Sequence, residues 1–272
     1  MNPNEIQLIA LDLDGTLLHE DKSISGYTLD VIRRLADRNI IIVPTTGRNI
    51  AGLKDNILNV QSIRYAICSN GANILDAGTG ELLHGCALSR KSALDTLDYL
   101  RQYPTFIYVH TSQGTVRSSD WETGGLAQRY PYVQFHENNV PDIGAFLSDP
   151  SITLWKIGVF TYDDETFRTL LEAGIPSPDM TLLRTGECNL EINSSEASKG
   201  NALRTLAEML GIPMSRVMAI GDNQNDISML KEAGVSVAMG NAQEDVKAAA
   251  DHVALTNEED GAAVFLAGCF GL

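Results

Sequence analysis

The sequence predicts an α/β protein with a Rossmann-like, three-layer parallel-sheet core and an inserted α+β cap domain. Apolar runs alternate with amphipathic helices at both ends of the chain, which indicates parallel strands joined by right-handed crossovers. The middle third carries hairpin patterns instead, and hairpins are typical of antiparallel strands. We therefore expect residues 1–80 and 193–272 to form the parallel-sheet core, and residues 81–192 to form the inserted cap.

The first part of the chain is expected to hold three strand-to-loop units. Each expected strand is a short run of Ile, Leu, Val or Ala that ends in a loop with polar residues, as buried parallel strands often do. The expected elements are a strand at 6–11, a helix at 28–39, a strand at 40–43, a helix between 50 and 58, and a strand at 65–68. Three such units in succession favour one parallel sheet.

The middle part breaks this rhythm with turn sequences rich in glycine. The expected elements are a hairpin at 74–83, a helix at 89–103, a hairpin of strands 106–109 and 115–117, a strand at 152–160, a helix at 165–173, and one or two strands within 181–192. Residues 118–150 are polar and weakly patterned, so no element is predicted there. This mixture predicts an antiparallel α+β unit.

The last part returns to alternating helices and strands. A helix at 199–210 has a good stop signal, because Gly211 and Pro213 follow it. The remaining expected elements are a strand at 217–220, a helix through Met229 and Leu230, a strand at 235–239, a helix at 245–250, a strand at 252–255 and a helix at 261–270. Together with the first part, these elements complete the core.

The composition limits the classes of partner. The chain has 272 residues, of which 44% are hydrophobic, and 35 acidic against 20 basic residues give a formal charge of −15. Such an acidic surface repels phosphate backbones and anionic lipid, so neither nucleic acid nor membrane is expected as a partner. An anionic substrate would then need a metal ion or a few placed cations.

The cysteines and the N-terminal segment indicate a cytoplasmic protein. The four cysteines show no C-x-x-C spacing, so we expect reduced thiols and neither a disulfide framework nor a zinc site. The N-terminal residues lack the basic and then apolar pattern of a secretory signal, and no apolar run approaches the roughly 20 residues that span a bilayer.

Four carboxylates are expected to meet at one edge of the core sheet. Asp12 and Asp14 follow the first strand and, two residues apart on extended chain, point the same way. Asp222 and Asp226 lie in the loop after a later strand, and the carboxyl ends of parallel strands are where open α/β folds bind ligands. Clustered carboxylates repel one another unless a hard cation or protons are present, and Mg²⁺ suits such oxygen ligands.

These loops carry five short motifs in a fixed order. They are Asp-x-Asp-Gly-Thr at 12–16, Thr-Gly-Arg at 46–48, Ser-Asn-Gly-Ala at 69–72, Ser-Lys-Gly at 198–200 and Gly-Asp-x-x-Asn-Asp at 221–226. In this order they resemble the haloacid dehalogenase superfamily, and more narrowly the Cof-type phosphatases with a large α/β cap between the second and third motifs. The resemblance covers residues 6–72 and 198–241, while the cap contributes only its position.

The resemblance implies a role for each motif residue. Asp12 is similar to the nucleophile that forms an aspartyl-phosphate, and Asp14 to the general acid and base. The metal ligands implied are the carboxylates of Asp12 and Asp222 and the main-chain carbonyl of Asp14. The phosphate-binding residues implied are Leu13, Thr46, Gly47, Lys199 and Asn225. The supporting residues implied are Arg48, Asn70 and Asp226, of which Asp226 would orient Lys199 or a metal-bound water.

Several of these residues also have plainer interpretations. Lys199 could be a solvated residue at a helix N-terminus, although the helix dipole slightly disfavours a lysine there. Arg48 is expected either to pair with a core carboxylate and fix its loop or to contact substrate. Asn70 could serve only a tight turn that supports the site. We expect Glu191, which ends a strand, to be a hinge or surface residue rather than a ligand.

The function predicted is Mg²⁺-dependent hydrolysis of small phosphorylated metabolites, with sugar phosphates as the class that the resemblance suggests, by a monomer or homodimer. The cap would close over the leaving group and set specificity. One alternative is a phosphomutase of the same superfamily, which would return the phosphoryl group to a sugar. Another is a non-catalytic protein that binds a phosphorylated metabolite, although binding alone does not need Asp14 as an acid.

Overall fold

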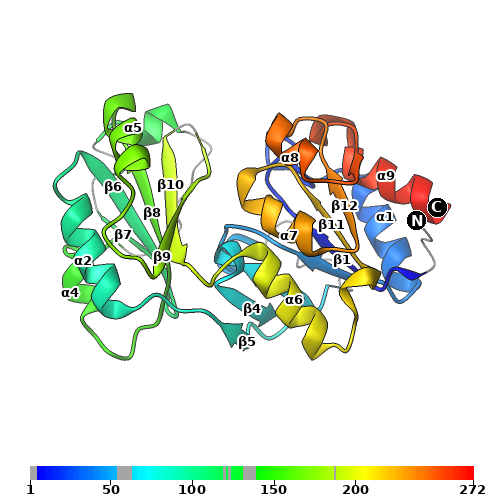
Figure 1. The fold of residues 1–272 in the computed structure, drawn as a ribbon, viewed down its shortest axis with the longest axis horizontal. Helices are drawn as coiled ribbons and strands as arrows, with labels where there is room; N and C mark the ends of the chain where they lie inside the picture. The colour runs from blue at the N-terminus through cyan, green and yellow to red at the C-terminus, as the bar shows by residue number, and fades with distance from the viewer. Residues whose placement is uncertain (1–4, 54–62, 119–120, 122–123, 131–138, 187) are drawn as a thin grey trace. The chain divides into compact units, whose positions relative to one another are not determined.

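The chain forms two compact units, each with its own hydrophobic core (Figure 1). The computed structural model describes residues 5–53, 63–118, 121, 124–130, 139–186 and 188–272. The first unit comprises Met1–His84 and Ser198–Leu272, and the second comprises Gly85–Ala197. The first is called the core unit below and the second the inserted unit. No helix in the described part of the chain is both long and apolar enough to cross a membrane.

The core unit is built on a five-stranded parallel sheet. Its strands, in spatial order, are β13 (His252–Val253), β12 (Val235–Ala238), β11 (Val217–Gly221), β1 (Leu8–Leu11) and β2 (Ile41–Pro44). β1 lies inside the sheet, where Leu8 pairs with Val217 on one side and with Ile41 on the other. All four residues of β1 are fully buried, as a strand covered on both faces requires.

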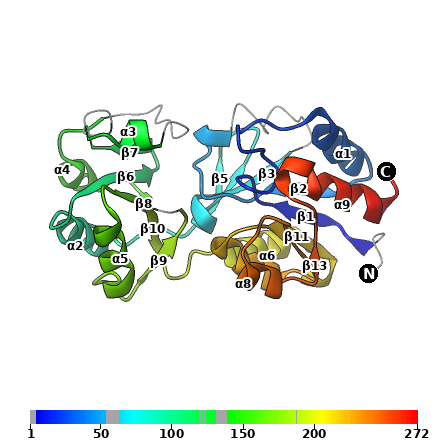
Figure 2. The same cartoon turned by 90° about the horizontal axis from the view of Figure 1, so that it is seen from above.

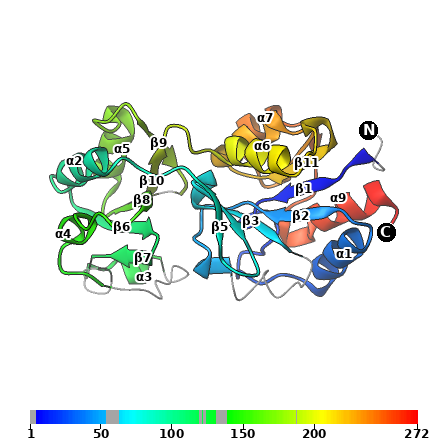
Figure 3. The same ribbon diagram turned by 90° about the horizontal axis from the view of Figure 1, so that it is seen from below.

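Helices cover both faces of this sheet (Figure 3). The helices on one face are α1 (Gly26–Asp37) and α9 (Gly261–Phe270), and those on the other are α6 (Lys199–Met209), α7 (Ile227–Glu232) and α8 (Glu244–Ala248). Successive side chains of β1 alternate between the two layers, because Ile9 and Leu11 pack with α1 and α9 while Leu8 and Ala10 pack with α6 and α7.

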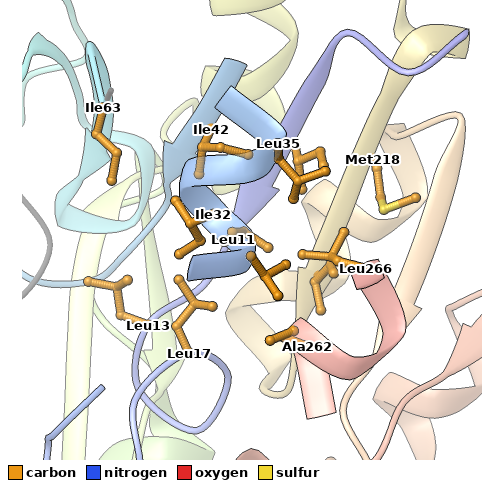
Figure 4. Close-up of a cluster of buried hydrophobic side chains, with 14 of the residues drawn as sticks. Leu11, Leu13, Leu17, Ile32, Leu35, Ile42, Ile63, Met218, Ala262 and Leu266 are labelled. Atoms are coloured by element: carbon orange, nitrogen blue, oxygen red, sulfur yellow. The ribbon is translucent and has the colours of Figure 1, made fainter. Parts of the chain in front are cut away.

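The chain just beyond β1 is anchored in this core by its apolar side chains. Figure 4 shows Leu13 and Leu17 pointing into the same hydrophobic cluster as Ile32 of α1 and Leu11 of β1. Leu13 is 1% exposed, whereas its neighbour Asp14 is only partly buried. The loop that carries the two predicted acidic residues is therefore held on one side by hydrophobic packing.

The expected third strand forms and lies parallel beside the end of β2, but it does not belong to the five-stranded sheet. β3 (Tyr65–Cys68) pairs antiparallel with β4 (Asn73–Asp76), and both belong to a small sheet of order β3-β4-β5 with β5 at Leu82–Gly85. A short 3-10 turn, Ser69–Gly71, separates β3 from β4, and a parallel return would need a much longer crossover. A single parallel bridge, Thr45 to Ile67, joins this sheet to the end of β2.

The helix expected between residues 50 and 58 begins with one 3-10 turn, Ala51–Leu53. The rest of that prediction falls on residues 54–62, which lie outside the described residues.

The inserted unit is built on a five-stranded sheet whose neighbouring strands run antiparallel. The spatial order is β7 (Gly114–Arg117), β6 (Thr105–Thr111), β8 (Leu154–Thr161), β10 (Asn189–Ser194) and β9 (Met180–Arg184). Side chains of α2 (Arg90–Leu100), α4 (Ile143–Leu147) and α5 (Asp164–Ala173) share one cluster with this sheet, and Figure 2 shows α2 and α5 alongside its strands. A parallel core with this antiparallel insertion confirms the predicted fold class.

Two short helices lie in the stretch where the sequence predicted no element, α3 (Leu126–Arg129) and α4. Each is only about one turn long, which is too short to leave a helical period in the sequence.

Glu191 contradicts the expectation of a hinge or surface residue. It lies inside β10, is 6% exposed, and accepts hydrogen bonds from Lys156 Nζ at 2.5 Å and from the Tyr108 hydroxyl at 3.0 Å. Alternation along the sheet places Glu191, Lys156 and Tyr108 on the face opposite the helices. A buried carboxylate is tolerated there because a buried ammonium neutralises it.

Candidate active site

The first predicted acidic residue directly extends β1 at its carboxyl end. The main-chain N–H of Asp12 donates to the carbonyl of Ile220 at 3.0 Å, so the parallel pairing with β11 continues one step beyond the strand. Asp12 as a whole residue is 5% exposed. It therefore lies at the centre of the sheet edge where open α/β folds hold their ligands.

A glycine lets the loop after β1 pass close to the loop after β11. Gly15 has a φ of +84°, and a Cβ there would lie 2.3 Å from Asp222 Oδ2. Asn241, in the loop after β12, donates to the Gly15 carbonyl at 2.9 Å. The neighbouring Thr16 donates from Oγ1 to Asp222 Oδ1 at 3.0 Å, so Thr16 fixes a carboxylate. No pattern in the sequence predicts the contact between Thr16 and Asp222, because 206 positions separate these two residues.

Lys199 is the first residue of α6, and its ammonium is buried beneath the same edge. Ser198 caps the helix by accepting from the Asn201 N–H at 3.0 Å. The Lys199 side chain is 1% exposed and donates to Asp12 Oδ1 and to Asp226 Oδ1, each at 2.6 Å. These contacts exclude the alternative of a solvated helix-terminal lysine.

Both carboxylate oxygens of Asp226 accept hydrogen bonds from other groups of the protein. Oδ1 accepts from Lys199, and Oδ2 accepts from the main-chain N–H groups of Asp222 and Asn223, each at 2.9 Å. The side chain is 0% exposed. Asp226 therefore both orients Lys199 and shapes the turn that presents Asp222.

Three carboxylates at this edge could share one cation. Oxygens of Asp12, Asp222 and Asp226 lie within 4.8 Å of one another. Burial, and then the charge of Asp226, raise the pKa of Asp12 above its usual range and that of Asp222 to about 7. Burial lowers the pKa of Lys199, but the charges of Asp12 and Asp226 outweigh it, so this pKa is raised. The charge of one lysine does not offset three carboxylates, and their raised pKa values indicate that these residues suit a further cation.

The amide side chain of Asn225, in the same loop as Asp222 and Asp226, has an oxygen that can still accept a hydrogen bond. Asn225 Nδ2 donates to Asn70 Oδ1 at 3.1 Å, while Asn225 Oδ1 is buried and has no hydrogen-bond partner among the described residues. An unsatisfied buried oxygen is costly, and a ligand or the hydration shell of a metal ion would supply a donor. Hard oxygen donors of this kind fit a divalent cation such as Mg²⁺.

Asp14 lies apart from the three carboxylates. Its Oδ1 contacts Arg48 Nη2 at 2.6 Å and Lys22 Nζ at 3.0 Å, and its Oδ2 accepts from Arg48 Nε at 2.7 Å. Burial alone would raise the pKa of Asp14, but the hydrogen bonds and charge of Arg48, followed by the charge of Lys22, lower it to about 2. Of the two interpretations of Arg48, the structure shows the pairing with a core carboxylate.

Sequence reasoning missed Lys22 altogether. It lies in a polar loop without periodicity, eight residues after Asp14, and only the fold returns it to that carboxylate. The parallel bridge between Asp14 and Leu18 shows that this segment folds back on itself, and no spacing rule in the sequence signals such a fold.

The remaining predicted phosphate-binding residues line the adjoining loops. Thr46 is 1% exposed after β2, where its N–H donates to the Ile67 carbonyl at 2.8 Å and its Oγ1 accepts from the Arg48 N–H at 3.1 Å. Gly47 follows it and is half-buried. The Leu13 carbonyl accepts from the N–H groups of three following residues, 16–18. Their binding of phosphate remains a prediction.

Comparison with known proteins agrees with this geometry. The model of the haloacid dehalogenase-like hydrolase family matches residues 9–266. Phosphatase YwpJ of Bacillus subtilis (strain 168) is 34% identical over 283 residues, which cover 95% of this chain and 98% of that protein. The 5-amino-6-(5-phospho-D-ribitylamino)uracil phosphatase YcsE of the same organism is 31% identical over 260 residues, covering 95% and 94% of the two chains.

The solved structures agree as well. A haloacid dehalogenase-like hydrolase from B. subtilis superposes with a TM-score of 0.84 at 31% identity, covering 96% of this chain and 99% of that one. The chain thus belongs to the haloacid dehalogenase-like hydrolase family, as the order of its motifs predicted. Within that family it is a phosphatase, a phosphoric monoester hydrolase.

Proposed function

We propose that this protein releases phosphate from small phosphorylated metabolites through an aspartyl-phosphate on Asp12, with Mg²⁺ as its metal. The observation that carries this proposal is the position of Asp12, which is buried at the end of β1 with Lys199 Nζ at 2.6 Å and with Asp222 close enough to share a cation. The relative YcsE is named for a substrate whose phosphate sits on a ribityl chain. That name supports a sugar-like leaving group for this protein too.

The carboxylates of Asp12 and Asp222 and the main-chain carbonyl of Asp14 would hold the metal. When bound, Mg²⁺ would offset the charge of these carboxylates and of the phosphoryl group, so that the two anions can approach each other. Lys199 would donate to a non-bridging phosphoryl oxygen, together with Thr46 and the main-chain N–H groups of residues 13 and 47. Such preformed donors are the main catalytic contribution in phosphoryl transfer.

In the first step a carboxylate oxygen of Asp12 forms a bond to phosphorus while the bond from phosphorus to the ester oxygen breaks. Asp14 gives its proton to the departing alcohol oxygen. In the second step Asp14 takes a proton from a water molecule, whose oxygen attacks the phosphorus of the aspartyl-phosphate. Inorganic phosphate leaves, and Asp12 is again a carboxylate.

The ion pair that Asp14 forms with Arg48 and Lys22 affects both of its proposed roles, as acid and as base. While Asp14 is paired with Arg48 and Lys22, its pKa is low and it remains a carboxylate. This is the form that Asp14 needs as the general base of the second step. The acid of the first step needs Asp14 turned toward the ester oxygen and released from at least part of this pairing. Substrate binding would therefore have to change the contacts of Asp14.

The experiment that tests this proposal measures phosphate released from a panel of phosphate monoesters with Mg²⁺ present. Asp12→Asn should lower kcat by more than about 1,000-fold, because an amide cannot form the acyl phosphate, while the far-UV circular dichroism spectrum stays unchanged. Asp30→Asn, at an exposed carboxylate on α1, is the matched control and should keep full activity.

Two outcomes would overturn the proposal. Near-normal turnover by Asp12→Asn would remove Asp12 as the nucleophile. An isomerised sugar phosphate in place of free phosphate would identify a phosphomutase instead.

A further inference from the structure

Two cations gather around the carboxylate of Asp14, and both can reach solvent. The guanidinium of Arg48 donates hydrogen bonds to both carboxylate oxygens of Asp14, and the Lys22 ammonium lies 3.0 Å from one of these oxygens. The side chains of Arg48 and Lys22 are 27% and 37% exposed, whereas Lys199 is 1% exposed. Lys199 is thus committed to the buried cluster, while Arg48 and Lys22 are able to exchange partners.

The proposed role of Asp14 requires such an exchange. Both oxygens of Asp14 are engaged in this arrangement, so the carboxyl group can reach an ester oxygen only by giving up at least one contact. A charged donor that gives up this contact needs another acceptor, either water, which both side chains can reach, or a group of the substrate. A carboxylate on the leaving group would be a geometric replacement, because the fork of Arg48 already binds a carboxylate side-on.

The backbone at Lys22 is also unusual. Lys22 has a φ of +66°, a region that favours glycine and asparagine over a long side chain. The turn is closed by hydrogen bonds from His19 N to the Ser23 carbonyl and from Lys22 N to the His19 carbonyl, at 3.0 and 2.9 Å. The His19 ring is in turn anchored to Asp260 at 3.1 Å. A lysine kept at a position better suited to glycine or asparagine points to a use for its side chain.

The electrostatic surroundings make these cations significant for a charged substrate. The neighbouring edge carries the carboxylates of Asp12, Asp222 and Asp226, and the whole chain has a formal charge of −15. A leaving group with its own negative charge would be repelled unless placed cations met it. Arg48 and Lys22 lie beside the residue that would protonate the leaving group, which is where such a charge would arrive.

We propose that Lys22 and Arg48 form a subsite for a carboxylate on the leaving group, so that phosphate monoesters of short hydroxy acids are preferred substrates. This inference rests on the proposed function, in which Asp14 contacts the ester oxygen. Three consecutive hydrogen bonds of about 2.8 Å, from the ester oxygen to Asp14, from Asp14 to a cation and from that cation to the substrate carboxylate, then limit the distance between the two ends to roughly 8 Å, and a chain of two or three carbon atoms stays within this limit.

The test compares two substrates of the same skeleton and configuration, D-3-phosphoglycerate and sn-glycerol 1-phosphate, in which a carboxylate of the first is a hydroxymethyl group in the second. The wild-type protein should give a kcat/KM at least about fivefold higher for the carboxylate substrate. Lys22→Asn removes the charge and suits the positive φ, so the variant should fold. It should lower the ratio of the two kcat/KM values roughly three- to tenfold, mainly through KM for D-3-phosphoglycerate.

Lys91→Gln is the matched control, because Lys91 is 85% exposed on α2 and pairs with Asp95, and it should leave the ratio unchanged. An equal loss for both substrates in Lys22→Asn would show that Lys22 only supports Asp14, and it would overturn the inference. A wild-type ratio of about one would overturn it too. Phosphate release from neither substrate nor any other monoester would instead refute the proposed function on which the inference rests.

A second measurement needs no turnover. In the Asp12→Asn background, calorimetry should show D-3-phosphoglycerate binding more tightly than sn-glycerol 1-phosphate, and adding Lys22→Asn should remove most of that difference. Equal affinities before the second substitution would contradict the subsite.

Discussion

Replacing Lys199 by methionine should strongly destabilise the metal-free core unit. The ammonium is 1% exposed and contacts two carboxylates at 2.6 Å, those of Asp12 and Asp226, whose side chains are 7% and 0% exposed. At an effective dielectric constant of 20, each contact has a gross Coulomb energy of about 6 kcal/mol, which desolvation of the charges largely offsets. Removing one partner of a buried ion pair costs about 3–5 kcal/mol, and we expect Lys199→Met to fall in this range.

The assay is urea unfolding of EDTA-treated protein at pH 7, followed by far-UV circular dichroism. The two tryptophans, Trp121 and Trp155, both lie in the inserted unit, so their fluorescence separates its unfolding from that of the core unit. Methionine retains most of the volume of lysine, so the loss reports the charge and not a cavity. Saturating Mg²⁺ should restore part of the lost stability, because the bound metal ion then offsets the carboxylate charges that Lys199 offsets in the unmodified protein.

Lys247→Met provides the control for this experiment. Lys247 pairs with Glu244 at 3.2 Å on the surface of the same unit, and that carboxylate is 92% exposed, so the change should alter the free energy of unfolding by less than about 0.5 kcal/mol. A loss below about 1 kcal/mol for Lys199→Met, or a loss equal to that of the control, would refute the reasoning from burial.

Two further predictions concern the metal site. Because the pKa of Asp222 is raised to about 7 in the folded protein, from an ordinary value of 3.8, the folded state binds the extra proton. The stability that this proton provides is complete below about pH 4 and is lost by about pH 7. The Tm of EDTA-treated protein should therefore rise as the pH falls from 8 to 5, and Asp222→Asn should flatten that rise; an unchanged slope would contradict the assignment. Gly15→Ala should lower both the Tm and the stabilisation by Mg²⁺, because its Cβ would lie 2.3 Å from Asp222 Oδ2. Gly80→Ala has a similar φ, +75°, and open space around its Cβ, so it should cost only about 1–2 kcal/mol of backbone strain and leave Mg²⁺ binding intact.

The sequence alone predicted the parallel core and the edge of its sheet at which Asp12 and Asp222 meet. Strands such as β1 and β11 are apolar runs bounded by acidic residues, and helices such as α6 carry periodic apolar positions with caps. Since every parallel strand delivers its C-terminal residue to the same edge, the order of strands and loops was enough to bring Asp12 and Asp222 together.

Only the tertiary structure decided how side chains far apart in the sequence pair. Thr16 holds Asp222 across 206 positions, Lys156 neutralises Glu191 across 35, and β3 pairs antiparallel with β4 while a single parallel bridge joins it to β2. Single polar residues have no period, and their partners are set by how strands and loops stack. For the same reason, the sequence identified Asp14 by its motif, and the fold alone showed that Arg48 and Lys22 hold it.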